Sequence, residues 1–166
     1  MIFVCLPSLC CLPVHDKKYT DQFSLDSRVV LRTSTRPYRY WNVATGSVKL
    51  KRKPTIIRKF KGLNSQDGHV SLLIPEKGLV KADHLNQYLT IFDFDEENAI
   101  DAEDMAAFTF LENKLDHGEW KTFFTYSTLF SKQLICIGSD SHLILINDEP
   151  VNLEDCHFQN LYPGEF

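Results

Sequence analysis

The part of the sequence that decides the fold is Phe60-Lys-Gly-Leu-Asn-Ser-Gln-Asp-Gly-His-Val70, because the chain contains a second copy of its frame. The copy is Phe110-Leu-Glu-Asn-Lys-Leu-Asp-His-Gly-Glu-Trp120. In both, an aromatic residue comes first, a glycine ninth and a large apolar residue last. Each copy lies between two runs of β-forming residues, which predicts a hairpin turn between two strands. A repeated hairpin indicates a repeated structural unit.

Around these turns the chain divides into three units of about four short β-forming runs, over residues 28–60 (unit A), 70–110 (unit B) and 120–161 (unit C). One such unit cannot bury its apolar face alone, whereas three units around an axis leave few strand edges open. We therefore predict an all-β fold, a β-trefoil of three four-stranded units with pseudo-threefold symmetry. An antiparallel β-sandwich is the alternative. The expected core layers contain Leu31, Phe60, Leu72, Phe110, Phe123 and Phe158.

The chain of 166 residues fits one domain, which we place at residues 19–166, after a tail or signal-like segment over residues 1–18. The net charge of −4 argues against a nucleic-acid binder. One basic run, Lys49-Leu-Lys-Arg-Lys53, opposes that trend, and it indicates either a solvated strand edge or a patch for an acidic partner. We expect a monomer, and beyond the N-terminal segment no apolar run is long enough to span a membrane.

The five cysteines are odd in number and lack the C-x-x-C spacing of a zinc site. Three of them lie in the apolar segment over residues 1–14, which has no Lys or Arg before its apolar core and contains two prolines. Removal of this segment as a signal peptide would leave Cys136 and Cys156, which could then pair. We favour a cytoplasmic protein with reduced thiols over a secreted one.

An acidic segment, residues 93–104, places oxygen side chains where a calcium-binding EF-hand loop has them. The ligands would be Asp93, Asp95, Glu97, Asp101 and Asp104. Asn98 stands where such a loop has glycine, and the last position is Asp instead of Glu. An acidic solvated loop is therefore the favoured interpretation, and we expect neither a metal nor a cofactor.

With the units aligned, the chain resembles the arabinose-binding β-trefoil module of fungal α-L-arabinofuranosidases over residues 28–161. That family repeats V-S-F…P-G-x-Y-L-R-H…L…D-A-T-F in each unit. Unit B carries Val70-Ser-Leu72, then Pro75 with Gly78, Leu89 and Met105-Ala-Ala-Phe108, and unit C carries Asp155-Cys-His-Phe158. The resemblance implies a trefoil fold with a sugar pocket in each unit.

In that family each pocket uses the His of Y-L-R-H and the Asp of D-A-T-F. The His is absent from all three units here, and the Asp remains only as Asp155, with Met105 and Pro54 at the other two positions. Other residues can serve instead, since aromatic rings stack on sugar faces and polar groups fix their orientation. The ligand-binding candidates are Tyr38, Tyr40 and Trp41 in unit A, His84 in unit B, and Gln133 and Asp155 in unit C. Each has a structural alternative, as a core aromatic or a surface polar group.

No catalytic pattern is present. Ser139-Asp-Ser-His142 contains the residue types of a catalytic triad, but such triads are assembled from distant parts of a fold, so this stretch indicates a hairpin turn. We predict a non-enzymatic, lectin-like binding module for carbohydrate. The alternative is a protein-interaction trefoil, cytokine-like or cytoskeletal, that uses the basic strand 49–61 and the acidic loop 93–104.

Overall fold

The computed structural model describes residues 27–62, 67–93, 105–116, 122–129, 131–150 and 152–165. The segment 1–18, expected to be a tail or signal-like, lies outside these ranges. The strands are β1 (Ser27–Thr33), β2 (Tyr40–Ala44), β3 (Ser47–Lys51), β4 (Ile57–Lys61), β5 (His69–Ile74), β6 (Gly78–Asp83), β7 (Tyr88–Phe92), β8 (Phe110–Asp116), β9 (Thr122–Thr128), β10 (Leu134–Ile137), β11 (Leu143–Ile146) and β12 (Phe158–Leu161). Two short 3-10 helices, η1 (Met105–Phe108) and η2 (Leu153–Cys156), precede β8 and β12.

The expected all-β class is confirmed, since the described residues contain no α-helix. Within the same ranges, no helix has the length and apolar character needed to cross a membrane.

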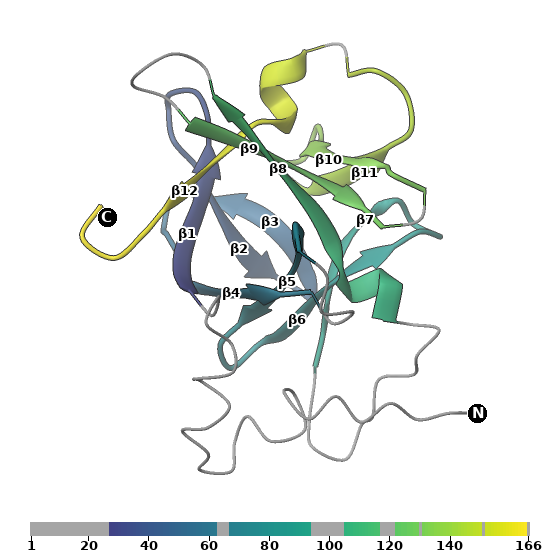
Figure 1. The fold of residues 1–166 in the computed structure, drawn as a ribbon, viewed down its shortest axis with the longest axis horizontal. Helices are drawn as coiled ribbons and strands as arrows, with labels where there is room; N and C mark the ends of the chain where they lie inside the picture. The colour runs from purple at the N-terminus through teal and green to yellow at the C-terminus, as the bar shows by residue number, and fades with distance from the viewer. Residues whose placement is uncertain are drawn as a thin grey trace.

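Six of the strands pair in a closed ring and form a barrel, which can be followed in Figure 1. Strand β1 pairs with β4, β4 with β5, β5 with β8, β8 with β9 and β9 with β12, and β12 returns to β1. All of these pairs are antiparallel, and the return of the last strand to the first leaves the ring without an open edge. The closed ring excludes the open two-sheet sandwich.

The other six strands form three hairpins, β2–β3, β6–β7 and β10–β11. They follow the carboxyl ends of β1, β5 and β9, respectively. The hairpins also contact one another through single pairs, Ser47 with Thr90, Tyr88 with Ile144, and Lys49 with His142. Together they cap one end of the barrel.

Each copy of the repeated stretch joins two neighbouring antiparallel strands, as its pattern predicts. The first copy joins β4 to β5, with Lys61 opposite Val70, and Gly68 has the left-handed φ of +77° that favours glycine. The second copy joins β8 to β9, with Asp116 opposite Thr122. The strand ends that the two copies join lie at the end of the barrel away from the cap, because they are opposite to the ends that carry the hairpins.

The core differs from the expected layers at two aromatic residues. Leu31, Leu72, Phe110 and Phe158 are fully buried in the main cluster, as expected, but the residue of β4 that joins them is Ile57. Phe60 belongs instead to a second cluster with Leu79 and Phe108. Successive residues of a strand face opposite sides, so Phe60 lies on the other face of β4 from Ile57.

Phe123 is the second correction to the expected core. It is half-buried and stacks on the His157 ring, 6.0 Å between centroids. Its neighbours on the opposite face of β9, Phe124 and Tyr126, contact the main cluster instead. The face of β9 that contacts the core is therefore that of Phe124 and Tyr126, and not the predicted face of Phe123.

Two residues beyond the layer of Ile57, Phe110 and Phe158, a polar cluster replaces the apolar core. The ammonium of Lys59 donates to both carboxylate oxygens of Glu112, at 3.2 and 3.0 Å. Asn160 donates to Glu112 at 3.3 Å, and the hydroxyl of Tyr126 donates to it at 2.7 Å. Lys59 is only 8% exposed. The basic strand 49–61, expected above as a contact surface for a partner, is thus not one continuous surface, because Lys59 faces the interior.

Candidate functional site

The aromatic residues proposed for unit A do not form one cluster. Trp41 is fully buried and packs edge-on against Tyr126 and Phe158, with ring centroids 5.7 and 5.0 Å away. It cannot stack on a ligand, so its assignment as a binding residue is wrong. Tyr40, the preceding residue of β2, lies on the opposite face and is half-buried.

Tyr38 is also half-buried, and a cation occupies one side of its ring. The guanidinium carbon of Arg32 lies 3.8 Å from the ring centroid, and that of Arg36 lies 5.6 Å away. The Arg32 side chain is held in turn by a hydrogen bond to Gln159 at 2.9 Å. A sugar could stack on that face of Tyr38 only by displacing this cation–π contact.

His84 and Gln133 were proposed in different units, and the structure brings them together. The Nδ1 of His84 lies 2.9 Å from the side-chain oxygen of Gln133. The same oxygen accepts from Ser131 at 3.1 Å, and the amide nitrogen donates to Gln87 at 2.9 Å. Gln133 is 4% exposed. It therefore connects β10 to the β6–β7 turn and is not a ligand-binding group, which corrects its assignment.

Asp155 lines a cavity of about 440 Å³ between the β10–β11 hairpin and η2. We call this cavity the C-terminal groove. Its apolar lining includes Ile137, Ile144 and Ile146, and its polar lining includes Asn147, Asp148 and Glu149. Within the described ranges, no hydrogen bond or ion pair engages the carboxylates of Asp148, Glu149 and Asp155.

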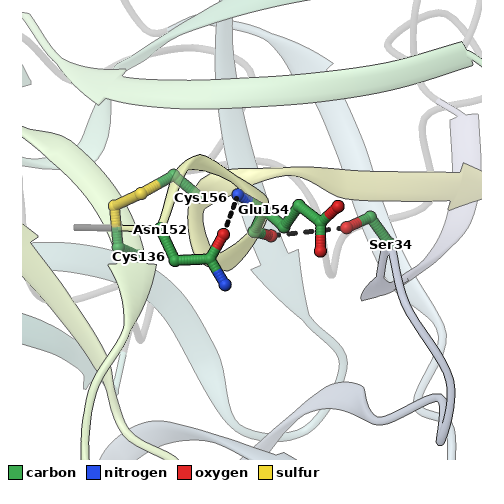
Figure 2. Close-up of a disulfide and its surroundings, with 5 residues drawn as sticks. All are labelled: Ser34, Cys136, Asn152, Glu154 and Cys156. Carbon is green, nitrogen blue, oxygen red and sulfur yellow. Dashed lines mark hydrogen bonds between the residues drawn. A yellow bond between two sulfur atoms is a disulfide. The ribbon is translucent and has the colours of Figure 1, made fainter. Parts of the chain in front are cut away.

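The wall of the groove that carries Asp155 is fixed at three points (Figure 2). A disulfide joins Cys136 of β10 to Cys156 of η2. Asn152 caps η2 by accepting from the amide of Glu154 at 3.2 Å. Ser34, which follows β1, donates to the carbonyl of Glu154 at 3.3 Å. This anchoring gives the exposed Asp155 a defined position on a short helix.

The disulfide corrects the expectation of reduced thiols. The sequence favoured a cytoplasmic protein, with the pairing of Cys136 and Cys156 as the secreted alternative, and the structure contains that pair. Disulfides of this kind persist in oxidising compartments.

The groove combines the features that recognise a hydroxyl-rich molecule. Carboxylate and amide oxygens accept hydrogen bonds from hydroxyl groups, and isoleucine side chains present an apolar surface to the ligand's C–H groups. Of the polar residues that line the groove, sequence reasoning singled out Asp155 but not Asn147, Asp148 or Glu149. Their signal was a polar stretch ending in Pro150, directly after an apolar strand, which also fits an ordinary turn.

The strand positions also correct the alignment of units B and C. Phe110 begins β8 as Phe158 begins β12, each after a short 3-10 helix. The residue of unit B that corresponds to Asp155 is therefore Ala107, three before Phe110, and not Met105. Unit B has no carboxylate at this position.

The calcium-loop hypothesis falls mostly outside the described residues. Asp93 is described and exposed, whereas Asp95, Glu97, Asp101 and Asp104 lie in the range 94–104 that the structure does not describe. Among the described residues, no group of three or more His, Cys, Asp or Glu side chains is placed to hold a metal ion.

Comparison of the sequence with protein-family models and with curated proteins gives no match. Among solved structures, the chain is similar to SeviL, in a structure of SeviL bound to asialo-GM1 saccharide. The TM-score is 0.56 at 8% sequence identity, and the alignment covers 83% of this chain and 98% of that one. At this identity the likeness concerns the fold.

Proposed function

We propose that this protein is a β-trefoil carbohydrate-binding module. The six-stranded closed barrel, the three hairpins that cap it and the pairing of those hairpins support the trefoil assignment. The fold similarity to SeviL, a protein solved with a bound saccharide, supports the carbohydrate class. The sugar type, including the arabinose implied by the family resemblance, is the part that the experiment below decides.

The observation that carries the proposal is the C-terminal groove. Its lining combines isoleucines with carboxylates that have no hydrogen-bond or ion-pair partner among the described residues, and one of its walls is anchored by a disulfide. A wall that is rigid before binding loses little conformational entropy when the ligand arrives, and this favours affinity. We place the binding role in this groove, with Asp155 as its central acceptor.

The role we propose is binding without catalysis. The stretch 139–142, which contains the residue types of a triad, forms the turn between β10 and β11, so its side chains follow one another along a hairpin. The disulfide supports an oxidising compartment, where a saccharide-binding module would meet extracellular glycans.

A panel of saccharides tests the proposal by isothermal titration calorimetry. The panel contains L-arabinose, D-galactose, their oligosaccharides and the asialo-GM1 saccharide. We expect at least one to bind, and we expect Asp155→Asn to weaken that binding about 10- to 100-fold, because hydrogen bonds to a charged group contribute about 1.5–3 kcal/mol.

The matched control is Asp93→Asn, which makes the same change at an exposed aspartate that does not line the groove. Its affinity should equal that of the wild type. A folded protein that binds no member of the panel would refute the carbohydrate class. Equal affinities of Asp155→Asn and wild type would remove the groove from the proposal.

A further inference from the structure

A second cavity lies where the three hairpins of the cap meet. Its volume is about 470 Å³, within the range of small-ligand sites. Each hairpin contributes to its lining, which includes Thr45, Asn86, Tyr88, Asp140, His142 and Ile144. We call it the hairpin pocket. None of the residues that the sequence singled out for ligand binding lines it.

The lining of the hairpin pocket offers both an aromatic surface and hydrogen-bonding groups. The rings of Tyr88 and His142 meet at 61°, with centroids 6.4 Å apart. In the part of the chain that the structure describes, the Tyr88 hydroxyl, the His142 ring nitrogens and the Asp140 carboxylate have no hydrogen-bond partner. His84 and Gln133 differ from these groups, because their side chains are hydrogen-bonded to each other.

Side-chain hydrogen bonds hold two of the turns that form the pocket. The Asp83 carboxylate accepts from the amides of Leu85 and Asn86, both at 3.1 Å, and from the Asn86 side chain at 2.8 Å. The hydrogen bond from the Asn86 side chain is the main reason that the pKa of Asp83 is lowered. In the β10–β11 turn, Arg39 donates to the Ser141 hydroxyl at 2.9 Å. The polar groups of the pocket are therefore held on ordered turns.

The hairpin pocket and the C-terminal groove are neighbours across the β10–β11 hairpin. Ile144 of β11 lines both cavities. On β10 the groove is lined as far as Ile137, and the lining of the pocket begins at the next residue, Gly138. A ligand in one cavity would thus reach the edge of the other without leaving the hairpin.

We propose that the hairpin pocket is a second subsite, and that it and the C-terminal groove together bind a neutral oligosaccharide that crosses the β10–β11 hairpin at Ile144. One sugar residue occupies the groove near Asp155. Another occupies the pocket, against Tyr88 and within reach of Asp140. This inference rests on the proposed carbohydrate-binding function and adds to it a requirement for chain length.

Calorimetric titration with a length series tests the inference. The probes are arabinan and galactan oligosaccharides, from the monosaccharide to the pentasaccharide. For the series that binds, we expect affinity to rise at least tenfold between the monosaccharide and the longer oligomers. Asp140→Asn and Tyr88→Phe should lower the affinity for the longer oligomers about 5- to 50-fold and leave that for the monosaccharide unchanged.

The groove variant and the control separate the two proposals. Asp155→Asn should weaken binding of every member of the series, and Asp93→Asn should change nothing. If Asp140→Asn and Tyr88→Phe bind the longer oligomers like the wild type while Asp155→Asn does not, the second subsite is refuted and the groove stands. If neither series binds while another saccharide of the panel does, the second subsite is refuted and the carbohydrate class stands. If no saccharide of the panel or of the series binds, both proposals are refuted.

A second measurement does not depend on the variants. In amide NMR spectra of the wild-type protein, the longer oligomers should shift the resonances of residues 138–142 and the monosaccharide should not. Shifts confined to the residues around η2 with every oligomer would overturn the inference.

Discussion

Tyr126 combines complete burial with a charged neighbour. Its hydroxyl donates to Glu112 at 2.7 Å and lies 2.9 Å from the side-chain oxygen of Asn160. Burial raises the pKa of this phenol well above its usual value, and the carboxylate of Glu112 raises it further. The neutral phenol is therefore the form that the folded protein stabilises.

This shift predicts a loss of stability in alkali. In the unfolded chain the phenol ionises near pH 10, whereas in the folded protein it keeps its proton to higher pH. Its contribution is fully present below about pH 10 and is lost as the pH rises above that value, by up to about 1.4 kcal/mol per pH unit. Urea denaturation at a series of alkaline pH values should show this slope in the wild type and a smaller slope in Tyr126→Phe.

The control for this prediction is Tyr40→Phe, which removes the hydroxyl of a half-buried tyrosine on β2. It should keep the wild-type slope. Identical alkaline slopes for wild type and Tyr126→Phe would show that the buried phenol does not govern this range.

At the scale of single residues, the sequence singled out one residue that lines a cavity, Asp155, because a carboxylate three residues before a core phenylalanine keeps a recognisable spacing. Its role in binding stays a prediction. Gln133 and Trp41 were wrong, because an amide or an indole looks the same in the sequence whether it faces a ligand or the interior. Only the fold shows that the side-chain amide of Gln133 is hydrogen-bonded to Ser131 and Gln87.

At the scale of elements, the short helix η2 depends on the disulfide for its position. It has four residues, too few to be stable alone, and the disulfide fastens its last residue to β10. The two cysteines are 20 positions apart in the sequence, so in the unfolded chain the bond restricts a loop of moderate length. A loop of that size corresponds to about 3 kcal/mol of stabilisation.

We therefore expect the double variant Cys136→Ala with Cys156→Ala to unfold more easily by about 2–4 kcal/mol. The same variant should bind saccharide more weakly, because the wall that carries Asp155 is no longer anchored. Chemical denaturation and calorimetry measure the two effects. Wild-type protein treated with a thiol reductant serves as the comparison and should behave like the variant. An unchanged denaturation midpoint would contradict this role of the bond.

The presence of strands could be predicted at this scale, but not always their inward face. Phe123 and Phe124 are adjacent, and both are apolar, so alternation does not say which one faces the core. The need for a glycine at position 78 has a clear structural cause. Gly78 begins β6 at a φ of +135°, and a Cβ at that position would collide with the backbone carbonyl of Phe92. This close approach gives a physical reason for a glycine at this position, three residues after Pro75.

For the whole molecule, closure depends on β12. This strand pairs with β1 on one side and with β9 on the other. Its removal would open the ring and expose two strand edges together with the core around Trp41 and Tyr126. The three-unit expectation rested on such closure, which repetition in the sequence can suggest. The polar cluster inside the barrel could not be foreseen, since Lys59, Glu112 and Asn160 lie far apart in the sequence.

A chain truncated after His157 should accordingly lose cooperative unfolding and associate in solution. Circular dichroism with thermal melting and size-exclusion chromatography measure these properties. A second truncation, after Tyr162, keeps β12 and should remain folded, with a cooperative melt. A cooperative melt and an unchanged elution volume for the shorter chain would show that the barrel does not need its last strand.

The register of β1 with β12 also sets how the domain would be displayed on a tether. Thr33 pairs with Phe158 beside the cap, where Arg32 meets the first hairpin, whereas Val30 pairs with Leu161 farther from it. The start of β1 and the end of β12 therefore leave the barrel together, at the end opposite the hairpins. A linker attached at either place would therefore begin at the end of the barrel opposite the β10–β11 hairpin, whose residues line both cavities.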